Sequence, residues 1–209
     1  MKIEMGESLF YSWLRHVKSC KIVQLNWKTS PTWDIAHEDE IASIIQSIST
    51  AFPNVFKKNT PRQLLIQAEL DAFGINFTEN DPKYLVVDVA CHLGGLGYGS
   101  KEENVEKVSE KMFRSALILY AYFATKKGDI IFAAPKINKG CYELLLKRMQ
   151  EIENFMNAKG FEYKFTLIAN KDFKKIVSSI TALSDDIADT SELFLRSYQL
   201  YQACQKFED

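Results

Sequence analysis

The sequence predicts an α/β fold with a mixed central sheet of about five strands flanked by helices. In the second half of the chain, apolar runs typical of strands alternate with segments whose apolar residues recur every three or four positions, as on a helix. Near the middle, two strand-like runs are separated by Glu79-Asn80-Asp81-Pro82, a turn of hairpin length. The run 84–90 is β-branched and apolar on both faces, which indicates a strand at the centre of the sheet.

The individual elements follow from these periodicities and from the residues that interrupt them. Pro53 ends the second predicted helix, and Gly160 ends the helix before the last strand. The predicted helices cover residues 6–18, 39–52, 102–124, 141–159, 171–180 and 191–207. The predicted strands cover residues 21–27, 64–77, 84–90, 129–134 and 161–169.

The 209 residues predict a single domain, 1–209, with enough chain to bury a sizeable core. Within it we expect a core at 6–180, a helical insertion at about 33–60 and a C-terminal helical appendage at 184–209. The absence of any internal repeat or clear linker supports one domain rather than two.

Composition excludes some classes of protein. A net charge of -1 argues against a protein that coats nucleic acid through bulk charge, although a local basic face remains compatible with it. The sequence begins with no signal segment and contains no apolar run of membrane-spanning length, so we expect a cytoplasmic protein without a membrane partner. The cysteines form no CxxC pair, which argues against structural zinc; they are Cys20, Cys91, Cys141 and Cys204.

Three carboxylates stand out on the two hairpin strands. Asp88 is the one charge in its strand, and Glu69 and Asp71 lie two residues apart in the strand before it. Because side chains alternate along a strand, we expect Glu69 and Asp71 on one face, with Asp88 brought beside them by the short turn. Gathered carboxylates repel one another unless a cation lies between them. The trio therefore predicts a site for Mg²⁺ or Mn²⁺, which suits a few carboxylates, several waters and a phosphate.

The order of these motifs resembles the PD-(D/E)XK nuclease superfamily, in particular its restriction-endonuclease-like and Holliday-junction-resolvase-like branches. The resemblance covers roughly residues 6–169 and rests on Glu7 in the first helix, the strand Ile22 to Trp27, Glu69-Leu70-Asp71 and Val86-Val87-Asp88-Val89-Ala90. It implies a restriction-endonuclease-like fold, metal ligands at Glu7, Asp71 and Asp88, and Glu69 as an additional carboxylate.

The chain departs from that family at Ala90. The family's third-strand motif has a lysine at this position, two residues after the acid, where it positions or activates the attacking water and stabilises the charged transition state. His92 is one candidate to replace it, since it shares the Asp88 face if the strand continues.

Lysines elsewhere offer further replacements for the missing motif lysine. Lys111 is the preferred candidate, because it stands in the middle of a helical stripe with Lys107 and Arg114, and the family includes members whose lysine comes from that helix. Lys101 and Lys136 are weaker candidates.

The leading functional hypothesis is a metal-dependent nuclease, of restriction or defence type, that hydrolyses phosphodiester bonds of DNA. Its catalytic residues would be Glu69, Asp71, Asp88, His92 and Lys111. The alternative is a catalytically inactive protein of the same fold that binds nucleic acid or serves as a scaffold subunit, an interpretation that Ala90 favours. A third interpretation is a structural or assembly protein with these acids on a solvated face. The expected partners are DNA and, in a homodimer, a second copy of the chain.

Overall fold

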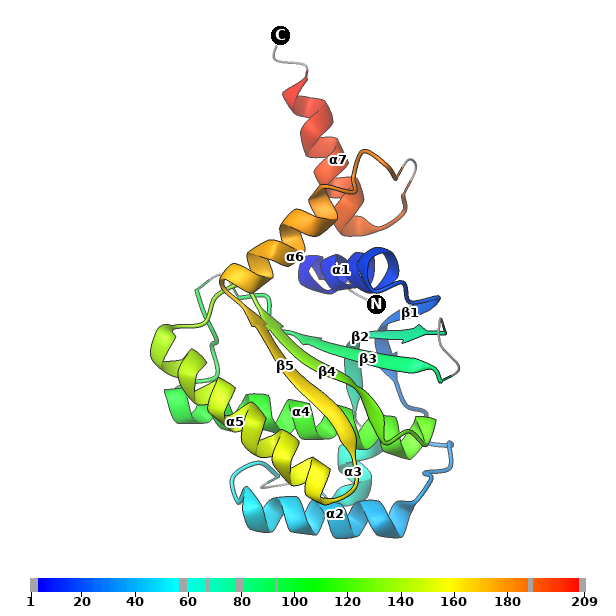
Figure 1. Cartoon of the computed structure of the whole chain (residues 1–209), viewed down its shortest axis with the longest axis vertical. Coiled ribbons are helices and arrows are strands. Elements are labelled where there is room, and N and C mark those ends of the chain that lie inside the picture. The colour runs from blue at the N-terminus through cyan, green and yellow to red at the C-terminus, as the bar shows by residue number, and fades with distance from the viewer. Residues whose placement is uncertain are drawn as a thin grey trace.

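The computed structural model describes residues 4–56, 60–66, 68–77, 81–92, 94–187 and 190–206. It confirms the predicted fold class: one five-stranded mixed sheet is flanked by helices on both faces (Figure 1). The strand order follows the chain, β1-β2-β3-β4-β5. The first three strands are antiparallel neighbours, and β4 and β5 each run parallel to the strand before them. The strands are β1 Ile22–Lys28, β2 Glu69–Asn76, β3 Lys83–Val89, β4 Lys127–Ala134 and β5 Glu162–Ala169.

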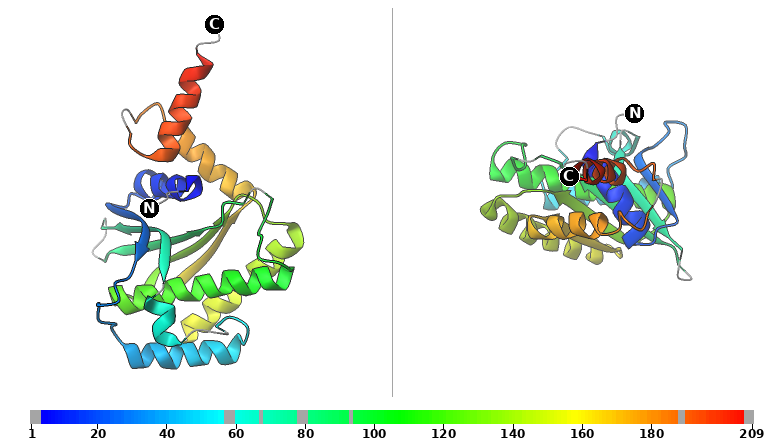
Figure 2. Two further views of the ribbon diagram at one scale, coloured as in Figure 1. Left: turned by 180° about the vertical axis from the view of Figure 1, so that it is seen from behind. Right: turned by 90° about the horizontal axis from the view of Figure 1, so that it is seen from above.

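Helices cover the sheet in unequal layers (Figures 1 and 2). On one face lie α1 (Met5–Ser12), the π-helix that continues it (Trp13–Val17) and α6 (Lys171–Thr181). On the other face lie α4 (Lys101–Phe123) and α5 (Lys139–Ala158), with α2 (Glu38–Ala51) and α3 (Pro61–Ile66) packed beyond α4. The last helix, α7 (Leu193–Gln205), packs its beginning against α1 and then extends away from the body.

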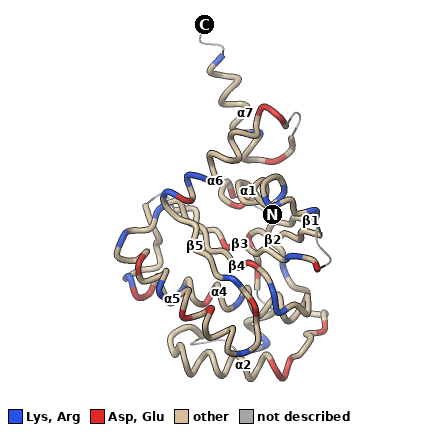
Figure 3. Tube along the Cα trace, in the orientation of Figure 1, with Lys and Arg blue, Asp and Glu red and all other residues tan. Residues whose placement is uncertain are grey.

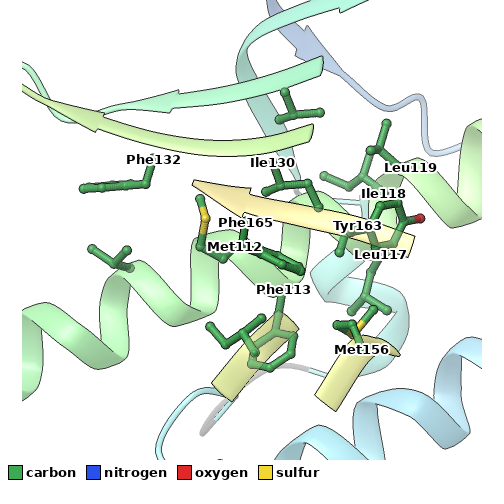
Figure 4. Close-up of a cluster of buried hydrophobic side chains, with 14 of the residues drawn as sticks. Met112, Phe113, Leu117, Ile118, Leu119, Ile130, Phe132, Met156, Tyr163 and Phe165 are labelled. Carbon is green, nitrogen blue, oxygen red and sulfur yellow. The ribbon is translucent and has the colours of Figure 1, made fainter. Parts of the chain in front are cut away.

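The sheet separates two apolar cores. The larger core surrounds α4: Met112 lies on the side of the helix that faces Ile130 and Phe132 of β4, whereas Phe113 points away from the sheet and packs against Phe155 of α5 (Figure 4). The smaller core lies under α1 and α6. Burial on both faces explains why β3 and β4 read as continuous apolar runs in the sequence.

The predicted strand 64–77 is wrong in its first part. Residues 61–66 form α3, and the strand begins only at Glu69. Thr60 and Gln63 cap this helix reciprocally: the Gln63 backbone N–H donates to Thr60 Oγ1 at 3.3 Å, and the Thr60 N–H donates to Gln63 Oε1 at 3.1 Å. The sequence Thr-Pro-Arg-Gln was the available signal for this helix, because Pro suits the first helical position. The apolar run that follows is also typical of a strand, and the strand prediction was based on that run.

Other predicted boundaries shift by a few residues at most. The first predicted helix becomes α1 and the π-helix, and the predicted insertion contributes α2, which contacts α3 and α4. Glu79 and Asn80 of the predicted turn, and Phe207 at the end of the last predicted helix, lie outside the described residues. No helix in the described part of the chain combines the length and the apolar character that a membrane span needs.

Candidate active site

The site is built around Asp88, near the end of β3. Its neighbours on alternate positions, Val86 and Ala90, belong to the core under α4, so the Asp88 side chain faces that helix. Lys111 of α4 meets it there, with its Nζ 2.5 Å from Asp88 Oδ1. The Lys111 side chain is 16% exposed and the Asp88 side chain 4%, so this is a buried ion pair. Burial lowers the pKa of Lys111, but the Asp88 charge and the hydrogen bond outweigh it, and the pKa is raised. The lysine is therefore a cation at neutral pH.

Asp71 joins the site where β2 and β3 separate. The paired residues of these two strands end at Ala72 and Val87. Beyond that point Asp71 Oδ2 accepts the Val89 backbone N–H at 2.8 Å, so a side chain takes the place of a strand partner. Burial, and then the charge of Asp88, raise the pKa of Asp71 to about 7. Asp71 and Asp88 thus form an electrostatically coupled pair that Lys111 only partly compensates.

Glu7 approaches the same place from α1. Asn26 of β1 has a left-handed backbone (φ 50°), and its Nδ2 donates to Glu7 Oε2 at 3.1 Å. The carboxylate also accepts the Glu4 backbone N–H at 3.1 Å. Its negative charge further raises the pKa of Asp71, which places Glu7 within electrostatic reach of the pair.

Tyr98 closes the site on the side of the glycine-rich loop. Burial raises the pKa of its phenol, and the neighbouring Lys111 charge opposes that shift. The Tyr98 backbone N–H donates to Asn104 Oδ1 at 3.2 Å, and the Asn104 amide donates to the carbonyls of Gly99 and Ser100. The buried Asn104 side chain therefore ties this loop to the first turn of α4.

Glu69 stands apart from these residues. Its carboxylate turns to Lys28 on β1 at 3.2 Å, whereas Asp71 turns to β3. The expectation of a regular strand through both acids is wrong, because Leu70 and Ala72 belong to opposite cores although they lie two positions apart. Strand alternation is interrupted at Asp71, opposite the left-handed Asn26.

The structure also distinguishes His92 from Lys111, the two candidates to replace the motif lysine that is missing at Ala90. Strand β3 ends at Val89, so the condition under which His92 would share the Asp88 face is not met, and the His92 side chain is exposed. Ala90 is buried and donates its backbone N–H to Ala133 O at 2.8 Å. In the predicted helical stripe, Lys107 pairs with Glu110 of its own helix, and Lys111 is the member that reaches Asp88.

The donor set for a metal ion is small. Within the described ranges, no three His, Cys, Asp or Glu side chains lie together as a set of metal ligands. Mg²⁺ is commonly held by only one or two carboxylates, with water and substrate phosphate completing its octahedron. Asp71 and Asp88 are the two carboxylates whose chemistry fits that requirement, and Glu7 is close enough to act on them electrostatically.

Two residues of the site were missed by sequence reasoning. Tyr98 lies in a loop read only as glycine-rich, and its proximity to Lys111 depends on the anchoring by Asn104. Asn26 was read as an ordinary strand residue; asparagine within an apolar strand was the available signal, since it tolerates the left-handed region better than most residues. No protein-family model, curated protein or solved structure matches this chain.

Proposed function

We propose that the chain is a metal-dependent nuclease that hydrolyses phosphodiester bonds of DNA. The observation that supports this most is the junction of Asp71, Asp88 and Lys111 at the point where β2 and β3 separate. Two carboxylates and one ammonium group, largely withdrawn from water, provide both a place for a divalent cation and a fixed positive group beside it.

The electrostatics of the pair favour a cation. A buried carboxylate whose pKa is raised to about 7 beside another carboxylate is disfavoured in its charged form. A divalent ion between Asp71 and Asp88 would reverse this, and when bound it would polarise the phosphodiester and lower the pKa of water. Perturbed acids of this kind are enriched at functional sites.

The roles of the protein side chains follow from their positions. Asp71 and Asp88 would hold the ion, and the hydrogen bond from Val89 N–H fixes the orientation of Asp71. Lys111 lies on the same side of the sheet as Ala90 and supplies the ammonium that the Ala90 position lacks. There it donates to the phosphate oxygens as negative charge develops on them.

The order of elements also supports the resemblance. A helix with an acid in its first turn, three antiparallel strands and a helix leading to a parallel fourth strand follow one another as α1-β1-β2-β3-α4-β4. Acids stand at Glu7, Asp71 and Asp88 along this order. Since a fold alone does not give an activity, the proposal depends on the site rather than on this order.

A second candidate is a catalytically inactive nucleic-acid-binding or scaffold protein. The observation that favours it is that Lys111 already neutralises Asp88 and that the described residues provide no set of three metal ligands. In that case the ion pair would serve the fold alone, and the nucleic acid would be bound without being cut.

A cleavage assay with matched variants separates the two. Wild-type protein, Asp88→Asn and the control Glu69→Gln are incubated with supercoiled and linear DNA in Mg²⁺, Mn²⁺ or EDTA. We expect cleavage that depends on the metal, a loss of at least about 100-fold in Asp88→Asn and no change in Glu69→Gln. Wild-type protein that binds DNA and metal yet cuts neither substrate would support the inactive alternative.

A further inference from the structure

We infer that five lysines at one edge of the sheet bind the phosphate backbone of the nucleic acid and lead it to Asp88. We call this surface the lysine rim: Lys101, Lys136, Lys139, Lys171 and Lys174. The inference rests on the proposed function, because it assumes that the ligand of the Asp88 site is a polynucleotide. It adds the surface that binds this ligand and the side from which it arrives.

The topology brings the rim together. Strands β3, β4 and β5 are parallel, so their carboxyl ends lie at one edge of the sheet, and each is followed by a helix that starts there. The three helices α4, α5 and α6 begin with Lys101, Lys139 and Lys171. Figure 3 shows Lys and Arg at the beginnings of α5 and α6. Asp88 lies near the carboxyl end of β3, at the same edge.

Lysine is an unfavourable choice at the first position of a helix, which Lys101, Lys139 and Lys171 occupy. The amino end of a helix carries partial positive charge, and carboxylates, not ammonium groups, are stabilising there. All five rim lysines are exposed, and none forms an ion pair with another described residue. By contrast, Lys175 pairs with Asp172 and Lys107 pairs with Glu110. The rim therefore concentrates positive charge from side chains and helix ends together, which a polyanion complements.

The rim is also held in a fixed geometry. Asn170 Oδ1 accepts the Ile137 N–H at 3.0 Å, and Asn170 Nδ2 donates to Ile137 O at 3.1 Å, so the loop before α5 is joined to the start of α6. The Lys101 side chain lies against the start of α5. If Gly140 carried a Cβ atom, that atom would lie 3.1 Å from Lys101 Nζ. Lysines from the two crossovers, through α4 and α5, and from α6 after the last strand thus form one surface.

Along α4, next to Lys101, a second surface repels a polyanion. Beyond Tyr98, a hollow of about 590 Å³ on α4 is lined by four glutamates, Glu102, Glu103, Glu106 and Glu110. One lysine, Lys107, lies among them and pairs with Glu110. A phosphate backbone is consequently excluded from this side and directed toward the rim.

The test measures binding without cleavage. A fluorescein-labelled DNA duplex of about 30 base pairs is titrated in EDTA by fluorescence anisotropy, at salt concentrations from about 50 to 200 mM. The variant Lys136→Gln/Lys139→Gln/Lys171→Gln is compared with wild type and with the matched control Lys83→Gln/Lys127→Gln/Lys164→Gln, which removes three charges from the strands outside the rim. Urea unfolding of both triple variants checks that the fold is unchanged.

We expect the rim variant to weaken binding by about tenfold or more and to reduce the slope of log affinity against log salt by about 3, one for each phosphate that loses its lysine. The control should change neither quantity by more than about twofold. Equal binding by the two triple variants, or no binding of the duplex by wild type at the lowest salt, would overturn the inference. If the rim variant loses binding but the wild-type protein cuts no DNA, the binding surface is supported and the proposed nuclease activity is rejected.

Discussion

Two lysine–carboxylate pairs, formed by acids that the sequence presents as equivalent, have different environments. Asp88 and Lys111 are almost wholly buried, whereas the side chains of Glu69 and Lys28 are 36% and 65% exposed. An exposed pair contributes about 0–1 kcal/mol to the free energy of unfolding. A buried pair is expensive to desolvate and is often no more stable than an apolar replacement. The buried pair is therefore poorly explained by stability, which directs attention to function.

The largest effect is expected from removing the lysine of the buried pair. Lys111→Met leaves Asp88 buried without its partner and should lower the free energy of unfolding by about 3–5 kcal/mol. The double variant Asp88→Leu/Lys111→Met should recover most of this loss, since no charge of the pair remains buried. Urea unfolding at neutral pH measures all three proteins. Equal destabilisation in the single and double variants would show that packing, not charge, dominates.

A smaller effect is expected from the protonation of Asp71. Its pKa is about 7 in the folded protein, against about 3.9 for an unfolded aspartate. The proton therefore favours folding fully below about pH 4, and this contribution is lost as the pH rises through about 7. The free energy of unfolding should fall on the order of a few kcal/mol across this window. Asp71→Asn, which keeps an acceptor for Val89 N–H, should flatten the dependence in urea unfolding at pH 5 and 8.

An unchanged pH dependence of stability in Asp71→Asn would contradict this prediction. If the variant loses stability between pH 5 and 8 as steeply as wild type, the titrating group lies elsewhere and the coupling of Asp71 to Asp88 is rejected. The comparison requires metal-free buffer, since a bound divalent ion would itself favour the charged carboxylate.

The smallest effect is expected at the exposed pair. Lys28→Met and Glu69→Gln should each change the free energy of unfolding by less than about 1 kcal/mol, because both side chains remain solvated. Chemical denaturation of both variants beside Lys111→Met gives the contrast directly. A loss at Glu69 comparable to that at Lys111 would remove the distinction between the two pairs.

The sequence predicted the regular parts of this site and missed the irregular ones. The apolar β3 and the long α4 are strongly periodic, so Asp88 on a central strand and Lys111 on the following helix were both predicted as candidates, Lys111 with the help of the family resemblance. Glu69 was grouped with Asp71 because period-two alternation was assumed, but the strands change faces at Asn26 and Asp71. A single left-handed residue in a strand leaves almost no trace in an apolar pattern.

Three further features of the site could not be predicted from apolar periodicity. His92 was a candidate only if β3 continued, and the strand stops at Val89, where the chain turns into the glycine-rich loop. Tyr98 enters the site through an anchor, Asn104, that is local in sequence but polar and therefore invisible to apolar periodicity. The lysine rim becomes apparent only when the starts of α4, α5 and α6 are placed at one edge of the parallel strands β3, β4 and β5.

A crystal structure of the protein soaked with Mn²⁺ would show whether Asp71 and Asp88 bind a divalent cation. We expect an anomalous-scattering peak about 2 Å from one oxygen of Asp71 and one oxygen of Asp88, with Lys111 retained beside it. Absence of a peak at millimolar Mn²⁺, with Lys111 still bound to Asp88, would contradict this expectation.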